Sequence, residues 1–391
     1  MPPLPHADIP QIFSSFWLAG FESGSQINRA GVRLDMLAST QHDQQAEADY
    51  ARLRSVGITT ARDAVRWRLI DRGGRYDFAS FAPMLAAAQR QRIQVIWALC
   101  HYGWPDDVDV FAPAFVDRFA RFARATARFV REHSDVVPYY TPINEMSYLA
   151  WAAGDAQYFH PYASGRGYEL KMQLTRAAIS AMEEVWAVDG RARFVHVDPI
   201  IHIAPQRGRE DLADEVEARR LGQFQSADML VGRLEPQLGG APRYLDIVGV
   251  NFYHNSEWEY PSGLWLGWAY KPLDDRWRPP HQILAEVYAR YGRPIFIAET
   301  SHYGAGRAAW LRFMLDEVQQ AWALGTPIGG VTLYPILDRH DWDRLDHWHN
   351  SGLWDLAPDG EGGLRRVLNT EYANELRRLQ AELAERRRIP L

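Results

Sequence analysis

Two glutamates each follow an apolar, strand-like segment. Glu145 lies in TPINEM at 141–146, and Glu299 lies in PIFIAETS at 294–301. In a protein of repeated βα units the carboxyl ends of the parallel strands meet at one face, so residues far apart in the chain come together there. Cleavage of a glycosidic bond with retention needs one carboxyl group as acid and base and a second as nucleophile, roughly 5 Å away. The two segments therefore predict a catalytic pair.

The pair needs a framework, and eight short apolar runs supply one. They lie near 14–19, 58–65, 93–99, 137–143, 193–198, 245–250, 294–298 and 328–334. Segments of helical period separate them, with apolar stripes formed by Phe115, Phe119, Phe122 and Phe129 and by Trp310, Met314, Val318 and Trp322. Strict alternation of strand and helix predicts a parallel sheet, and eight repeats predict an α/β fold closed as a (β/α)8 TIM barrel.

Polar side chains follow nearly every predicted strand at its carboxyl end. They are Glu22, Gln26, Arg62, Arg66, His101, Asn144, Glu145, His196, Asp198, Asn251, Tyr253, Glu299, Asp338 and Asp341. The amino ends of the same strands show no such pattern. This distribution is typical of a site for a ligand with many hydroxyl groups.

Composition sets further bounds. No Gly/Ser-rich or Pro-rich linker divides the 391 residues, so we expect a single barrel domain over 1–391 with an aromatic-rich loop insertion at about 252–278. The net charge of −6, without a basic cluster, argues against a nucleic-acid partner. The single cysteine, Cys100, allows no intrachain disulfide.

Without a signal-like N-terminus or a run long enough to span a bilayer, we expect a cytoplasmic protein with no membrane partner. Nothing in the sequence indicates an oligomeric state.

The chain carries 15 Trp and 18 Tyr. Many of them must fill the core, but aromatic faces also pack against the C–H faces of sugars. Four tryptophans fall in the insertion, at 258, 265, 268 and 277. Two interpretations remain open for them: they stack on the leaving group of a substrate, or they cap the barrel.

The motifs together resemble glycoside hydrolase family 1, the retaining β-glycosidases. In chain order they are FWLAGFESGSQI at 16–27, Arg62 five residues before Trp67, LCHYGWP at 99–105, TPINEM, DIVGVNFY at 246–253 and LYPILDRHDW at 333–342. Each motif is loose, but six in the correct order are specific. The resemblance runs almost end to end and implies a β-glucosidase-like or β-galactosidase-like hydrolase of carbohydrate metabolism.

The resemblance implies a role for each matching residue. Glu145 would be the acid/base and Glu299 the nucleophile, with Arg62 and Tyr253 favouring the ionised nucleophile and Asn144 holding the hydroxyl at C2. The residues implied in substrate binding are Gln26, His101, Trp104, Asn251, Tyr334, Asp341 and Trp342. The expected ligand is a small glycoside or oligosaccharide, and neither a cofactor nor a metal is implied.

Several positions depart from the family pattern. Asn28 replaces the glutamate after Gln-Ile, Thr300-Ser301 replace Asn-Gly after Glu299, and Tyr334 replaces the tryptophan of strand eight. Asp341 replaces a glutamate that grips outer hydroxyls of the glycon. Because aspartate is one methylene shorter, the preferred sugar is expected to differ from glucose.

A 6-phosphate substrate is disfavoured, because the Ser, Lys and Tyr set of the phospho-glycosidases is missing. Arg339 and Arg344 are cations that can pair with a phosphate, so the 6-phosphate substrate stays open as an alternative.

Three other functions remain as alternatives. The departures at Thr300 and Asp341 are compatible with a carbohydrate-binding pseudoenzyme. The acid and histidine cluster at 338–349 invites a metal-dependent hydrolase, although its spacing matches no known zinc motif. A transglycosylase on the same barrel would share the site and differ only in its acceptor.

Overall fold

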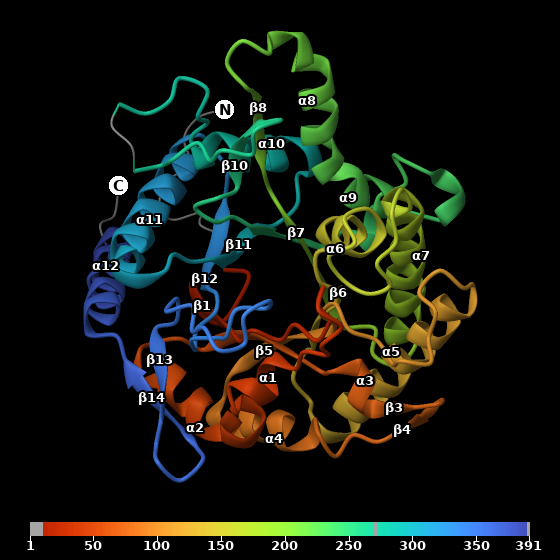
Figure 1. The fold of residues 1–391 in the computed structure, drawn as a ribbon. Coiled ribbons are helices and arrows are strands. Elements are labelled where there is room, and N and C mark those ends of the chain that lie inside the picture. The colour runs from red at the N-terminus through yellow and green to blue at the C-terminus, as the bar shows by residue number, and fades with distance from the viewer. Residues whose placement is uncertain (1–10, 270–271, 389–391) are drawn as a thin grey trace.

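The computed structural model describes residues 11–269 and 272–388, and its centre is a closed barrel of eight parallel strands (Figure 1). In chain order the strands are β1 (Trp17–Gly20), β2 (Thr60–Ala64), β5 (Gln94–Cys100), β6 (Tyr139–Ile143), β7 (Arg193–Pro199), β9 (Ile247–Asn251), β11 (Ile295–Thr300) and β12 (Ile328–Leu333). Each pairs with its neighbours in the chain, and β12 closes the barrel on β1. The predicted strands and the predicted TIM barrel are confirmed.

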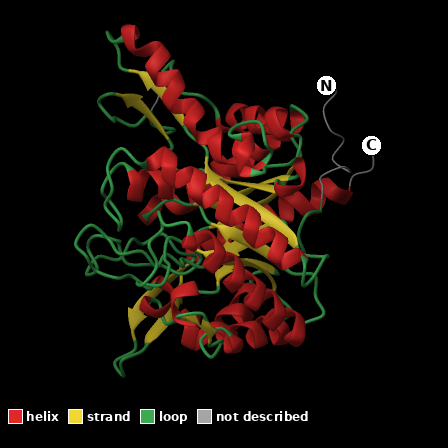
Figure 2. Cartoon of the chain, turned by 90° about the vertical axis from the view of Figure 1, so that its right-hand side faces the viewer, coloured by secondary structure: helices red, strands yellow, loops and turns green. Residues whose placement is uncertain are grey.

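Helices surround the barrel, and loops gather on one side of it (Figure 2). The helices are α1 (Met36–Ser39), α2 (His42–Ser55), α3 (Trp67–Ile70), α4 (Ala82–Gln91), α5 (Ala114–His133), α6 (Met146–Gly154), α7 (Gly167–Trp186), α8 (Ala213–Leu221), α9 (Gln225–Leu230), α10 (Pro280–Tyr291), α11 (Arg307–Ala323) and α12 (Thr370–Arg388). Within the described residues, no helix has both the length and the apolar character that crossing a membrane requires.

Two apolar layers hold these elements together. Inside the barrel, Leu18, Ile96, Val195 and Phe296 belong to a cluster that fills the interior and is closed below by Phe13. Outside, the predicted aromatic stripe of α5 is buried against Trp67, whose ring centre lies 4.9 Å from that of Phe119. Side chains therefore fill the interior of the barrel and leave no room for a ligand there. A ligand site is expected above the carboxyl ends of the strands.

The insertion is more ordered than the predicted loop. It contains β10 (Glu257–Tyr260), which pairs in parallel with β8 (His202–Pro205) beyond the barrel, near α8 at the top of Figure 1. Trp268 packs on Trp310 of α11 at 5.1 Å between ring centres, and Trp277 packs on Phe313. These two tryptophans cap the barrel wall, whereas Trp265 is 53% exposed.

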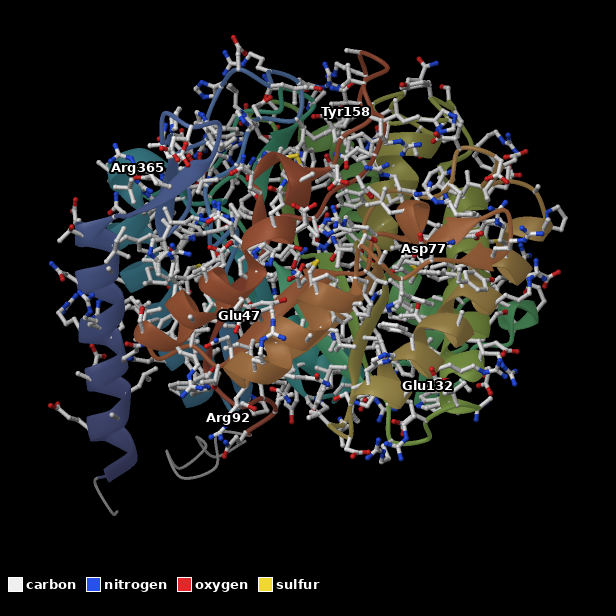
Figure 3. The ribbon with its side chains drawn as sticks, turned by 90° about the horizontal axis from the view of Figure 1, so that it is seen from below. Glu47, Asp77, Arg92, Glu132, Tyr158 and Arg365 are labelled. Atoms are coloured by element: carbon white, nitrogen blue, oxygen red, sulfur yellow. The ribbon has the colours of Figure 1, made fainter. Side chains whose placement is uncertain are left out.

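Two short hairpins complete the chain. One pairs β3 (Asp71–Arg72) with β4 (Arg75–Tyr76), and the other pairs β13 (Trp354–Pro358) with β14 (Leu364–Leu368). In Figure 3 the two ends of the barrel lie on opposite sides of the molecule. Tyr158, which follows β6 and α6, lies across the molecule from Arg92 and Glu132, which precede β5 and β6.

A buried ion cluster ties the second hairpin to the barrel. His42 contacts Asp49 and Asp63 at 2.9 Å each, and Arg366 of β14 donates to both oxygens of Asp49. Burial by itself would lower the pKa of His42, but Asp63 and Asp49 outweigh it and raise that pKa to about 9. The imidazole is therefore a cation in the folded protein at neutral pH.

We expect the stability of the fold to fall in mildly alkaline solution. Because the folded-state pKa of His42 lies above its ordinary value of 6.5, its contribution is complete below pH 6.5 and is lost as the pH rises through about 9. The free energy of unfolding, measured with urea, should drop by roughly 3 kcal/mol over this interval. The drop should be missing in His42→Gln and kept in His133→Gln, which changes an exposed histidine. An equal drop in both variants would contradict this assignment.

Candidate active site

A cavity of about 350 Å³ opens above the carboxyl ends of the strands. It is lined by Glu22, His101, Tyr102, Glu145, Tyr148, Pro199, Asn251, Tyr253, His254, Asn255, Ser256, Glu299, Ser301, His302, Tyr303, Tyr334, Pro335, Arg339, Trp342, His349 and Ser351. These residues come from both halves of the chain, and both predicted catalytic glutamates are among them. The volume and the mixture of aromatic and polar groups suit a small polar ligand.

Glu299 lies within β11, one residue before its end, and receives a hydrogen bond at each oxygen. Arg62 of β2 donates to Oε1 at 2.7 Å, and the hydroxyl of Tyr253 donates to Oε2 at 2.8 Å. The Arg62 guanidinium is buried and also donates to the carbonyl of Ala298. A cation and a phenol held in this way stabilise a carboxylate rather than a carboxylic acid.

Glu145 follows β6 and immediately precedes α6. Its backbone adopts φ 49° and ψ 60°, a left-handed conformation that is uncommon for a residue with a β-carbon. Its N–H donates to the carbonyl of Val197 on β7, which holds the turn in place. Backbone strain of this kind concentrates at functional sites, where the surrounding structure enforces it.

The surroundings of Glu145 favour its protonated form. Burial raises the pKa of Glu145 most, the negative charge of Glu299 raises it further, and the result is about 8. Hydrogen bonds from Asn251 to Oε1 and from the hydroxyl of Tyr102 to Oε2 act in the opposite direction. These surroundings therefore favour a carboxylic acid at Glu145 at neutral pH, in the same cavity as Glu299, which is partnered by arginine.

A continuous chain of hydrogen bonds joins the two glutamates. Arg62, bound to Glu299, donates through its other terminal nitrogen to Oδ1 of Asn144 at 2.6 Å. The Asn144 amide nitrogen lies 3.4 Å from the hydroxyl of Tyr102, which donates to Glu145. Arg62 and Asn144 are buried behind the cavity wall, so this chain holds both carboxyl groups in a defined relation.

Tyr102 is a site residue that the sequence analysis did not identify. It lies within LCHYGWP, directly after His101, with φ 63°. This left-handed turn directs its ring toward Glu145, and nothing in the residue types around it predicts such a turn. The only signal in the sequence was its place beside His101.

The lining of the cavity also contains His101, Trp342, Glu22 and Arg339. The Nδ1 of His101 contacts the hydroxyl of Ser23 at 2.8 Å. Burial, followed by the charge of Arg62, lowers the pKa of His101 well below its ordinary value, so its ring stays neutral. Glu22 was noted in the sequence only as a polar residue after the first strand.

Seven of the predicted site residues line the cavity together: His101, Glu145, Asn251, Tyr253, Glu299, Tyr334 and Trp342. Arg62 and Asn144 lie directly behind them. The ring of Tyr334 lies so close to Gly20 that a β-carbon there would come within 2.0 Å of it. Glycine at the end of β1 therefore allows Tyr334 to reach the cavity.

Gln26, Trp104 and Asp341 lie outside the lining of the cavity. The chain turns after β1, so that the amide of Gln26 is fully buried beside Gly24 while Glu22 reaches the wall. Trp104 is buried near Phe115 and His160.

Asp341 uses one oxygen to accept the backbone N–H groups of Asp343 and Arg344, which shapes its own loop. None of these three side chains lines the cavity, so their part in substrate binding stays a prediction from the resemblance.

Two departures from the family pattern have structural roles. The hydroxyl of Thr300 accepts a hydrogen bond from the indole of Trp310 at 2.8 Å, so Thr300 anchors α11. The amide of Asn28 donates to the carbonyl of Trp342 at 2.8 Å and thereby holds that side of the cavity. In residues 11–269 and 272–388 no group of three or more His, Cys, Asp or Glu side chains is arranged to hold a metal ion.

Comparison with solved structures shows the same fold. The β-glucosidase of Thermotoga maritima in complex with castanospermine superposes with a TM-score of 0.73 and 14% identity, covering 98% of this chain and 100% of that one. A family 1 β-glucosidase of T. maritima gives 0.74 and 12% over the full length of both chains, and the complex with glucoimidazole gives 0.74 and 13% over 98% and 100%. No family model and no curated protein matches the sequence. The chain therefore has the barrel of the family 1 β-glucosidases, as its motifs predicted.

The surroundings of Glu145 lead to two predictions of opposite sign. Glu299→Gln removes a nearby negative charge and should lower the pKa of Glu145 below about 8. Tyr102→Phe removes a donor to its carboxylate and should raise that pKa above about 8. Both shifts can be followed by carbon NMR titration of labelled glutamate side chains, with Glu145→Gln to assign the signal. Shifts of the same sign would contradict this description of the site.

Proposed function

We propose that this protein is a retaining β-glycosidase that hydrolyses a β-linked glycoside by double displacement. Glu299 is the nucleophile, and Glu145 is the acid and base. One observation carries the proposal: two buried glutamates of one cavity have opposite surroundings, a cation at Glu299 and a raised pKa at Glu145. Retaining glycosidases need one ionised and one protonated carboxyl group.

In the first step Glu145 donates its proton to the leaving oxygen, and Glu299 attacks the anomeric carbon. Arg62 and Tyr253 hold the attacking carboxylate by both oxygens, so it is oriented before the substrate arrives. A covalent glycosyl ester forms on Glu299, and the aglycone leaves with the proton.

In the second step the same residues exchange roles. The ester has no negative charge, so one of the two main causes of the raised pKa of Glu145 is gone and this pKa falls. Glu145 then accepts a proton from the incoming water, which attacks the ester and releases the sugar. The hydrogen bonds from Tyr102 and Asn251 support the ionised Glu145 during this stage.

Unpartnered polar atoms in the cavity wall support a sugar as the ligand. In the described part of the chain, Nε1 of Trp342, Oδ1 of Asn251 and Oγ of Ser351 are buried without a hydrogen-bond partner. Buried polar groups are normally paired, so a ligand with several hydroxyl groups would complete them. The matched T. maritima β-glucosidases were solved in complex with castanospermine and with glucoimidazole, which supports a small-molecule ligand for this barrel.

The proposal predicts turnover of at least one aryl β-glycoside from a panel of glucoside, galactoside, fucoside, xyloside, mannoside and glucuronide. Glu299→Gln should lower kcat at least 1,000-fold, because the nucleophile is lost, while the free energy of unfolding stays similar. Glu145→Ala should spare the first step for an activated leaving group and should be rescued by azide, which needs no base. Initial rates and product analysis measure both effects.

The same panel tests the other candidate functions. Sugar binding without turnover would indicate a binding protein, and loss of activity with a chelator would indicate a metal-dependent hydrolase. A transglycosylase would form mainly a new glycoside when a sugar acceptor is added.

The wild-type rate should also decline above about pH 8, where Glu145 loses its proton.

A further inference from the structure

A third buried glutamate faces the same cavity, paired with the only arginine among the lining residues. Glu22 lies two residues after β1, and the Nε of Arg339 lies 3.5 Å from its Oε2. The Glu22 side chain is 3% exposed and the Arg339 side chain 17%. The motifs that resemble the glycosidase family do not assign a role to either position.

A purely structural role explains only half of this arrangement. Oε1 of Glu22 accepts the backbone N–H of Gly24 at 2.9 Å, which stabilises the turn after β1. A neutral glutamine or asparagine would serve that turn equally well, without the cost of burying a charge. The second oxygen instead lies beside the guanidinium, at a cavity surface where a ligand can reach both groups.

Arg339 is oriented toward the cavity by its neighbours. One terminal nitrogen donates to the carbonyl of His340, and the guanidinium lies 5.2 Å from the ring centre of Trp342. A guanidinium fixed in this way offers its remaining N–H groups in one plane. The pair therefore presents acceptors on Glu22 and donors on Arg339 side by side.

The charges around the cavity exclude one class of ligand. Glu22 and Glu299 line it together with the protonated Glu145 and a single arginine, and Arg62 behind the wall is already bound to Glu299. His101, His254 and His349 add no positive charge at neutral pH, because burial lowers the pKa of His101 well below its ordinary value and lowers those of His254 and His349 to about 4. Arg344 does not line the cavity. An anionic sugar would meet Glu22 wherever it met Arg339.

We propose that Glu22 and Arg339 form a clamp that binds two adjacent hydroxyl groups of a neutral glycon and rejects glycons that carry a carboxylate or a phosphate. Glu22 accepts a hydrogen bond from one hydroxyl, and Arg339 donates to its neighbour. Both residues determine specificity and take no part in bond cleavage. This inference rests on the proposed function for its substrate class, and it rules against the 6-phosphate substrate that the sequence left open.

The test compares the wild type with Glu22→Gln on the best neutral aryl β-glycoside, its singly deoxygenated analogues, and the matching uronide and 6-phosphate. We expect kcat/KM for the parent glycoside to fall roughly 10- to 100-fold, since a hydrogen bond to a buried charge is lost. For the analogue that lacks the bound hydroxyl, the loss should nearly vanish. The rates on the uronide and the 6-phosphate, relative to the parent, should rise.

Two further variants sharpen the test. Asp346→Asn removes one negative charge from an exposed position of the same loop as Arg339, and it should leave every ratio unchanged. The double variant Glu22→Gln/Arg339→Gln should lose less than the product of the two single losses, because the residues act as a pair. Equal losses on all analogues, with unchanged discrimination against anions, would show that Glu22 only supports its turn and would overturn the clamp.

Failure of the clamp can be told from failure of the proposed function. If the wild type turns over nothing on the panel, the glycosidase proposal fails. Binding of the free neutral monosaccharides is then measured by tryptophan fluorescence, since Trp342 lies beside Arg339. Binding weakened at least tenfold by Glu22→Gln but not by Asp346→Asn would still support the clamp, and binding unaffected by Glu22→Gln would refute it.

Discussion

The site depends on the ion pair between Arg62 and Glu299. Two carboxyl groups buried in one cavity repel each other, and burial penalises each charge. Arg62 lies 2.7 Å from Glu299 and stabilises its negative charge. Glu145 has no such cation, so burial and the charge of Glu299 favour its protonated form. The difference between two identical side chains is thus produced by their surroundings, chiefly the Arg62 guanidinium at Glu299 and the burial of Glu145.

The barrel makes this pairing possible because it brings β2 and β11 to the same face, although Arg62 and Glu299 are 237 residues apart. Their polar atoms are buried, so each must find its partners within the protein. Asn144 and Tyr102 extend the pairing to Glu145, which leaves the two carboxyl groups little freedom to adopt other arrangements. Ordered side chains reduce the cost of binding a substrate in the reactive geometry.

The pair formed by Glu22 and Arg339 in the cavity lining differs from the pair formed by Arg62 and Glu299. There, Glu22 and Arg339 are close enough to attract each other but are separated by 3.5 Å, with hydrogen-bonding capacity left for a ligand. The site thus holds two charged pairs, and we propose that Arg62 and Glu299 serve chemistry while Glu22 and Arg339 serve recognition. Residues that depart from the family pattern, such as Asn28 and Thr300, support the loops and helices around these walls.

The sequence by itself determined the barrel and most of the cavity. Apolar runs with β-rich composition reported all eight strands, because burial on both faces of a parallel strand leaves a continuous hydrophobic segment. The polar residue at each strand end then located His101, Glu145, Asn251, Tyr253 and Glu299, since parallel topology sends all carboxyl ends to one face. Only the tertiary structure decided which side chains turn inward between these ends. The left-handed turn at Tyr102, the placement of Glu22 rather than Gln26 at the wall, and the use of Asp341 within its own loop depend on loop backbone angles. Those angles are set by contacts between loops distant in the chain, and no local pattern of residue types records them.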